Sequence, residues 1–130
     1  MAGPEGDAAP TVSDVIGLVV DSVSSTEVLA HIDVDERHHQ GTGTVHGGVY
    51  AHVIESVATI GARAAVRDAG LNALGISNQT DFLRPFARGR LDIAGRPVQQ
   101  GRTLQLWVVE ISNGDGKLVS RGQVRLFNQG

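Results

Sequence analysis

Apolar residues recur at every second position in residues 27–34, which is the period of a strand with one buried face. A first, apolar strand is predicted over residues 15–23, and the turn "SSTE" joins the two. The polar segment 35–44 that follows is expected to be a loop. The alternating apolar residues of the second strand are Val28, Ala30, Ile32 and Val34.

The next segment changes to a helical period and predicts one long helix over residues 47–69. This segment is apolar on most sides up to Ala65 and becomes polar at Arg67 and Asp68. Gly70 is well placed as its C-terminal glycine. A helix that is apolar nearly all round is expected to be buried.

Beyond the helix the chain is rich in strand-forming residues, divided by the turn signals "ARG", "QQG" and "NGDG". Pro85 cannot donate to a ladder, so the first of these strands should have a bulge or an edge there. The order β-β-α-β-β-β-β predicts an α+β fold in which a curved antiparallel sheet of about six strands wraps one long helix. The four later strands are predicted over residues 74–86, 89–100, 102–112 and 117–127.

Composition narrows the possible functions. The 130 residues suit one domain, expected over residues 11–130 after a flexible tail at residues 1–10. The net charge of −3 gives no basic excess for nucleic acid. The absence of cysteine excludes disulfides, thiolate metal sites and a cysteine nucleophile. No secretory signal or membrane-spanning run is present, so we expect a soluble cytoplasmic protein.

The glycine pair Gly47-Gly48 stands at the start of the predicted helix. A helix N-terminus presents unpaired N–H groups and a partial positive charge, and glycine lets a ligand oxygen approach the backbone closely. The pattern "VHGG" before an apolar run therefore fits an oxyanion hole, although a tight turn alone would also favour two glycines.

Glu55 is a carboxylate in the middle of this apolar helix, with no basic residue three or four positions away. Burial of an unpaired carboxylate costs free energy or raises its pKa. His52 and Thr59 are the helix neighbours that could pair with it. Two interpretations follow: a partly exposed residue on the helix edge, or a reactive carboxylate in a cleft.

Gly47 and Glu55 lie eight residues apart, which is about 12 Å along a helix axis. A single substrate carbonyl cannot easily contact both residues of one helix. If both act on it, one must come from a second copy of the chain. Catalytic roles for these residues therefore predict a homodimer with two shared active sites.

Four segments resemble the hotdog-fold acyl-CoA thioesterases of the PaaI-like group, from about residue 12 to residue 127. Most of that group has Asp at the position of Glu55. Glu is similar to the branch of 4-hydroxybenzoyl-CoA thioesterases that uses a catalytic Glu, which also has Gln and Thr where this chain has Gln40 and Thr59. The segments are "HGGVYAHVIESVATIGA", "SNQTDFLRPFARGRL", "QQGRTLQLWVVEI" and "DGKLVSRGQVRLF".

The resemblance implies hydrolysis of an aryl- or medium-chain acyl-CoA thioester to the free acid and CoA. The Gly47 N–H would polarise the thioester carbonyl, and Glu55 of the partner subunit would act as nucleophile or general base. Gln40 would position the substrate or the water. Thr59 would orient Glu55 or the water, and His46 would order the loop through hydrogen bonds.

The resemblance also implies CoA contacts through Arg84, Arg102 and Thr103, residue types that suit phosphate. Gly48 belongs to the same binding segment, and Tyr50 either lines the acyl pocket or is ordinary core. CoA is part of the substrate, although an acyl carrier protein could replace it, and no separate cofactor is implied. Pairs of dimers would make tetramers.

Two other functions stay open. A hotdog hydroxyacyl-thioester dehydratase or hydratase uses a His with an acidic residue, and His46 and His52 are available. A non-catalytic acyl-CoA-binding protein would keep the fold but lack the carboxylate that Glu55 supplies. A metal enzyme is disfavoured because no two histidines form an H-x-x-x-H or H-E-x-x-H pair, and a serine hydrolase because no G-x-S-x-G segment occurs.

Overall fold

The computed structural model describes residues 9–130, so most of the expected N-terminal tail lies outside the described residues. One antiparallel sheet has the strand order β1-β2-β4-β5-β6-β3. No helix in the described part is long and apolar enough to cross a membrane. The elements are α1 (Val12–Ile16), β1 (Val19–Val23), β2 (Val28–Val34), α2 (Gly47–Val66), β3 (Asn72–Phe82), β4 (Gly89–Gln100), β5 (Leu104–Ser112) and β6 (Leu118–Gln129).

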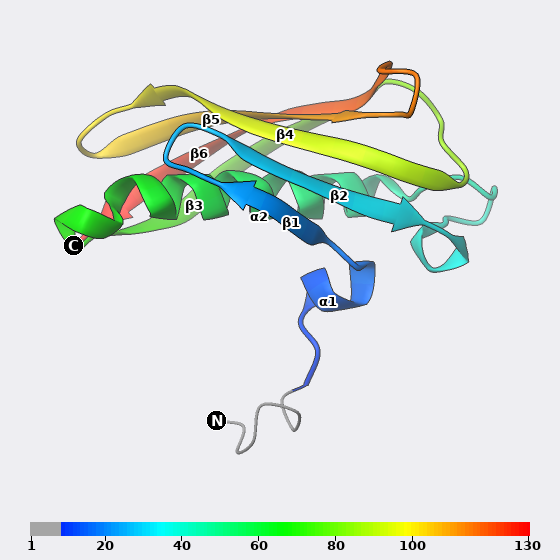
Figure 1. The fold of residues 1–130 in the computed structure, drawn as a ribbon, viewed down its shortest axis with the longest axis horizontal. Coiled ribbons are helices and arrows are strands. Elements are labelled where there is room, and N and C mark those ends of the chain that lie inside the picture. Colours follow the sequence, from blue (N-terminus) through cyan, green and yellow to red (C-terminus); the bar gives the residue numbers. More distant parts are fainter. Residues whose placement is uncertain (1–8) are drawn as a thin grey trace.

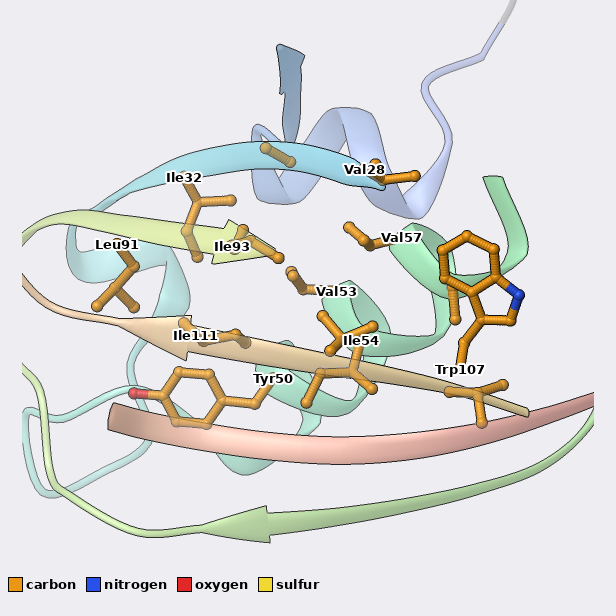
Figure 2. Packing of buried hydrophobic residues seen from close by; sticks show 14 of the residues in the cluster. Val28, Ile32, Tyr50, Val53, Ile54, Val57, Leu91, Ile93, Trp107 and Ile111 are labelled. Carbon is orange, nitrogen blue, oxygen red and sulfur yellow. The ribbon is translucent and has the colours of Figure 1, made fainter. Parts of the chain in front are cut away.

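The sheet curves over α2, which confirms the predicted α+β hotdog arrangement (Figure 1). The buried face of α2 packs on apolar side chains of β2, β4 and β5 (Figure 2). The predicted alternation in β2 is confirmed, because its four alternating apolar residues are buried and the residues between them are not. The helix therefore fills the concave side of the sheet, and its opposite face is left for other contacts.

The boundaries of α2 follow from its sequence. His46 caps the start, where its Nδ1 accepts a hydrogen bond from the Gly48 N–H at 2.8 Å. The α-helix ends at Val66, and a 3₁₀ turn over Arg67–Ala69 completes the predicted span. Gly70 has a φ of 74°, as expected for a C-terminal glycine.

The structure corrects the first predicted strand. Residues Val12–Ile16 form the short helix α1, and β1 begins only at Val19. Thr11 and Asp14 make a reciprocal capping box at the start of α1, and Gly17 ends it with a φ of 79°. The valine-rich composition favours a strand, but these local caps close one turn of helix instead.

The expected irregularity at Pro85 is also corrected. β3 ends at Phe82, so Pro85 lies in the connection to β4 and interrupts no ladder. The bulge of β3 lies between Gly75 and Ser77. β3 pairs only with β6 and is an edge strand of the sheet.

Trp107 on β5 packs against the helix. A Cβ added at Gly61 of α2 would lie 2.3 Å from the Trp107 ring, so only glycine allows this approach. The indole N–H donates to Gln105 Oε1 at 2.9 Å, and Gln105 Nε2 donates to the Ala62 carbonyl at 3.0 Å and to Asn128 Oδ1 at 2.9 Å. This satisfied polar network joins α2, β5 and β6 within the core.

We expect Gly61→Ala to destabilise the fold by about 1–3 kcal/mol, since the new methyl overpacks a ring that is fully buried and hydrogen-bonded. Urea unfolding followed by circular dichroism measures the change. Gly114→Ala is the matched control, because nothing lies within 4 Å of a Cβ there. Equal stability of the two variants would show that the Trp107 contact is not tight.

Candidate active site

Two separate cavities lie along α2. The Gly47 cavity, of about 330 Å³, is at the start of the helix, and the Glu55 cavity, of about 380 Å³, is beside its middle. The Gly47 cavity is lined by Gln40, Thr44, Val45, Gly47, Tyr50, Phe82, Leu83, Arg84 and Pro85. The Glu55 cavity is lined by Ser13, His52, Glu55, Ser56, Thr59, Ile60 and Arg63.

The Gly47 N–H is the free donor at the start of α2. The Gly48 N–H donates to His46 Nδ1, and the Val49 N–H donates to the His46 carbonyl at 2.9 Å. The Gly47 N–H has no acceptor among residues 9–130. It can therefore bind a substrate oxygen with the help of the helix dipole.

The Phe82 ring packs against Gly47 at the place that a side chain would take. A Cβ added at Gly47 would be 2.6 Å from Phe82 Cζ, although the Phe82 side chain is 62% exposed. Gly47 is therefore required for close approach to its backbone. Gln40 and Arg84 line the same cavity, and Gln40 Nε2 donates to Thr44 Oγ1 at 3.2 Å.

Glu55 is exposed to its cavity and lies beside β3. A Cβ added at Gly75 would be 3.6 Å from Glu55 Oε2. Thr59 lies one turn further along α2 and lines the same cavity, but neither Thr59 nor His52 hydrogen-bonds the Glu55 carboxylate. The pairing considered for Glu55 from the sequence is thus absent within residues 9–130, and the carboxylate is free to meet a ligand.

His52 instead bonds two serines. Its Nε2 lies 2.7 Å from Ser13 Oγ of α1 and 3.2 Å from Ser56 Oγ. Burial lowers the pKa of His52 below its ordinary value, and the nearby negative charge of Glu55 opposes part of that shift. A neutral imidazole beside the carboxylate is the expected state at pH 7.

Sequence reasoning did not assign several of these lining residues to the site, among them Phe82, Ser13, Ser56 and Arg63. Phe82 lies two residues before Arg84 in the segment "FLRP", so the predicted role of Arg84 could have indicated Phe82 as a second residue of the cavity. Ser13 gave no signal, because α1 was not predicted. Ser56 and Arg63 follow Glu55 on the exposed side of α2, and the helical period alone could have added them to the cavity.

Arg102 and Thr103 line neither cavity. The Arg84 N–H donates to the Val119 carbonyl near the start of β6, whereas the Asn128 N–H near its end donates to the Thr103 carbonyl. These β6 residues are nine apart, or roughly 30 Å along a strand. One chain therefore does not bring Arg102 and Arg84 to the same place.

The chain belongs to the thioesterase superfamily, whose family model matches residues 42–120. The candidate esterase Rv1847 of Mycobacterium tuberculosis is 38% identical over 115 residues, which cover 87% of this chain and 82% of the relative. The 1,4-dihydroxy-2-naphthoyl-CoA thioesterase 2 of Arabidopsis thaliana is 32% identical over 121 residues, covering 87% of this chain and 76% of that protein.

Solved structures agree with the family. Rv1847 superimposes with a TM-score of 0.88 at 37% identity, covering 91% of this chain and 96% of that one. AziG of S. sahachiroi superimposes with a TM-score of 0.89 at 36% identity, covering 94% and 98% of the two chains. The fold is the hotdog thioesterase fold, and the chain is an enzyme of the thioester hydrolase class.

We expect the ring protons of His52 to titrate by NMR with a midpoint below about 6.5, the ordinary value for histidine. Glu55→Gln should lower the midpoint further, because it removes the charge that favours the imidazolium. The folded state then binds fewer protons than the unfolded state below about pH 6.5. The His52 contribution to stability is full above that pH and is lost as the pH falls through the folded-state pKa.

Urea unfolding at several pH values checks this linkage. Between about pH 5 and pH 7, His52→Gln should reduce the rise of unfolding free energy with pH that the unmodified protein shows. A midpoint at or above the ordinary value, or an unchanged rise in the variant, would be incompatible with a half-buried neutral His52.

Proposed function

We propose that the protein is an acyl-CoA thioesterase whose active site combines the Gly47 cavity of one subunit with Glu55 of a second. The observation that carries the proposal is the separation of a free oxyanion donor and a free carboxylate into two cavities on one rigid helix. Each cavity by itself has only part of the machinery for acyl transfer.

The proposed reaction adds water across the thioester bond. The Gly47 N–H donates to the carbonyl oxygen, where negative charge develops as the carbon becomes tetrahedral. As general base, Glu55 takes a proton from a water molecule while the oxygen of that water bonds to the carbonyl carbon. The C–S bond then breaks, and the CoA thiolate takes the proton from Glu55. As nucleophile, Glu55 forms an anhydride and releases the thiolate, and water then cleaves the anhydride.

Three neighbouring side chains have supporting roles in this proposal. Gln40 borders the Gly47 cavity and positions the substrate or the water. Thr59 borders the Glu55 cavity and orients the carboxylate or the water. His46 caps α2 and so holds the Gly47 N–H at the helix start, which is an ordering role without proton transfer.

The free edge of β3 provides a way to join the two cavities. Edge strands expose unpaired backbone groups, and on β3 the exposed Ile76 adds apolar area. Gly75 lies beside Glu55, and Phe82 lies against Gly47. In an antiparallel β3–β3 pair about a two-fold axis the two strands run in opposite directions, so the Gly75 half of each strand lies towards the Phe82 half of the other. Such a pairing brings Glu55 towards the other subunit's Gly47 cavity.

CoA is the proposed acyl carrier. The exposed guanidinium of Arg84 at the Gly47 cavity suits a phosphate of the nucleotide. Arg102 and Thr103 can serve the same CoA only from another subunit, because of their distance from Arg84. Gly48 does not line the Gly47 cavity and its N–H is already bonded to His46 Nδ1, so a contact of Gly48 with CoA stays a prediction.

The proposed acyl groups are aryl or medium-chain. The Glu at position 55, with Gln40 and Thr59, favours the branch of 4-hydroxybenzoyl-CoA thioesterases that uses Glu. Relatives named for 1,4-dihydroxy-2-naphthoyl-CoA and for acyl-coenzyme A support an acyl-CoA substrate. We further propose a cytoplasmic enzyme without a separate cofactor, assembled as a dimer of dimers.

One observation favours a second candidate. His52 and Glu55 line the same cavity, and a hydroxyacyl-thioester dehydratase or hydratase needs a His with an acidic residue. The two functions differ in product. Hydration of an enoyl-CoA leaves the thioester intact, whereas hydrolysis releases a free thiol that a thiol reagent detects.

Glu55→Ala should lower kcat/KM for release of CoA thiol from aryl- and alkyl-CoA esters by at least about a hundredfold, which is around 2.7 kcal/mol of barrier. Glu110→Gln is the control, since this residue lines neither of the two cavities and pairs with Arg121. Comparable activity in Glu55→Ala and the wild type would mean that another group performs the reaction.

A further inference from the structure

The Tyr50 hydroxyl is buried without a partner. The Tyr50 side chain is 3% exposed, and its oxygen is the one buried side-chain nitrogen or oxygen among residues 9–130 that has no hydrogen-bond partner. Leaving a buried hydroxyl unpaired costs stability, whereas phenylalanine would fill the same space without that cost. The orphaned hydroxyl therefore needs an explanation.

The position of this hydroxyl connects it with the Gly47 cavity. Tyr50 is three residues after Gly47 on α2, and it lines that cavity. Figure 2 shows the Tyr50 ring at the end of the core opposite Trp107, with its oxygen directed away from Trp107. Side chains of a helix lean towards its N-terminus, which here is the end where the cavity lies.

Phe82 is the side chain that an incoming ligand must displace. Its ring centroid lies 6.2 Å from that of Tyr50, and the same ring covers Gly47. Phe82 is largely exposed and is the last residue of β3, so burial does not fix its ring. An acyl group taking its place would lie against both Gly47 and the Tyr50 ring.

The burial of Tyr50 raises its pKa to about 12, so the phenol stays protonated at neutral pH and is available as a donor. On the core side Tyr50 is followed by the buried residues Val53 and Ile54 of α2, whereas Gln40, Thr44 and Arg84 line the cavity beside it. A buried donor at a fixed point of a pocket selects ligands that carry an acceptor atom at that point.

We propose that the Tyr50 hydroxyl donates a hydrogen bond to an oxygen on the acyl group of the substrate, so that Tyr50 selects acyl-CoA esters whose acyl group bears a hydroxyl or oxo substituent. The inference rests on the proposed function, because the thioester held at Gly47 delivers the acyl group to this pocket. It assigns Tyr50 a specific bond, beyond lining the cavity.

The test compares the wild type with Tyr50→Phe on benzoyl-CoA and the three monohydroxybenzoyl-CoA isomers. The wild type should prefer at least one hydroxylated isomer over benzoyl-CoA by about tenfold or more in kcat/KM, since a site built to bond an oxygen rejects the analogue that lacks it. Tyr50→Phe should lose that preference, with a larger fall for the hydroxylated ester than for benzoyl-CoA. Urea unfolding should show that the variant is at least as stable as the wild type.

Each outcome separates the hypotheses. A Tyr50→Phe enzyme that keeps the wild-type ratio between esters overturns the assignment and leaves a buried water as the partner of the hydroxyl. A wild type with no preference for any hydroxylated isomer also overturns it. If Tyr50→Phe is less stable than the wild type and its kcat/KM falls equally for all esters, the hydroxyl has a structural role and the assignment is also overturned. If the wild type releases thiol from none of the esters, the proposed function fails as well.

Discussion

The close contact between α2 and the sheet is the constraint on which the rest of the structure depends. Glycine allows it at three points: Gly61 faces Trp107, Gly95 faces Val57, and Gly122 faces Ile54, and a Cβ at any of them would lie under 3 Å from its neighbour. Such contacts fix the rotation of the helix about its axis, because a turned helix would bring other side chains against the sheet. They thereby decide which residues of α2 face outward.

A helix held in this way fixes the distance between its functional groups. The free N–H of Gly47 and the carboxylate of Glu55 keep their separation whatever ligand arrives, because the rise per residue is fixed. Both groups flank β3, the strand whose outer edge is unpaired. The same packing that stabilises one subunit therefore leaves its two reactive groups apart and presents them along an edge that favours pairing with a second copy.

Local patterns predicted the elements that bury a continuous face. The period of two in β2 and the turn signals around β4 located these strands closely, because burial of one face imposes the alternation. The short helix α1 was missed since it buries no residue and depends on caps alone. Phe82 was missed as a neighbour of Gly47 because the contact joins residues 35 positions apart through the curvature of β3, which no local period encodes.

Some features of the candidate site were likewise predictable from local sequence, and others required the tertiary structure. The geometry of one helix was enough to predict that Gly47 and Glu55 do not meet within a chain, and the two cavities agree. The Ser13–His52–Ser56 contacts depend on how α1 docks on α2, so they required the tertiary structure. The orphaned hydroxyl of Tyr50 likewise emerges only when every buried polar atom has been matched with a partner.

Mixed dimers test whether one active site draws on residues of two subunits. Gly47→Val obstructs the oxyanion donor and Glu55→Ala removes the carboxylate, so each variant alone should be inactive. In a dimer of one chain of each kind, one site receives both defects and the other receives none. Co-expression with random pairing makes half of the dimers mixed, so we predict about a quarter of the wild-type activity. Mixed dimers that are folded and as inactive as their parents would contradict the proposed two-subunit site.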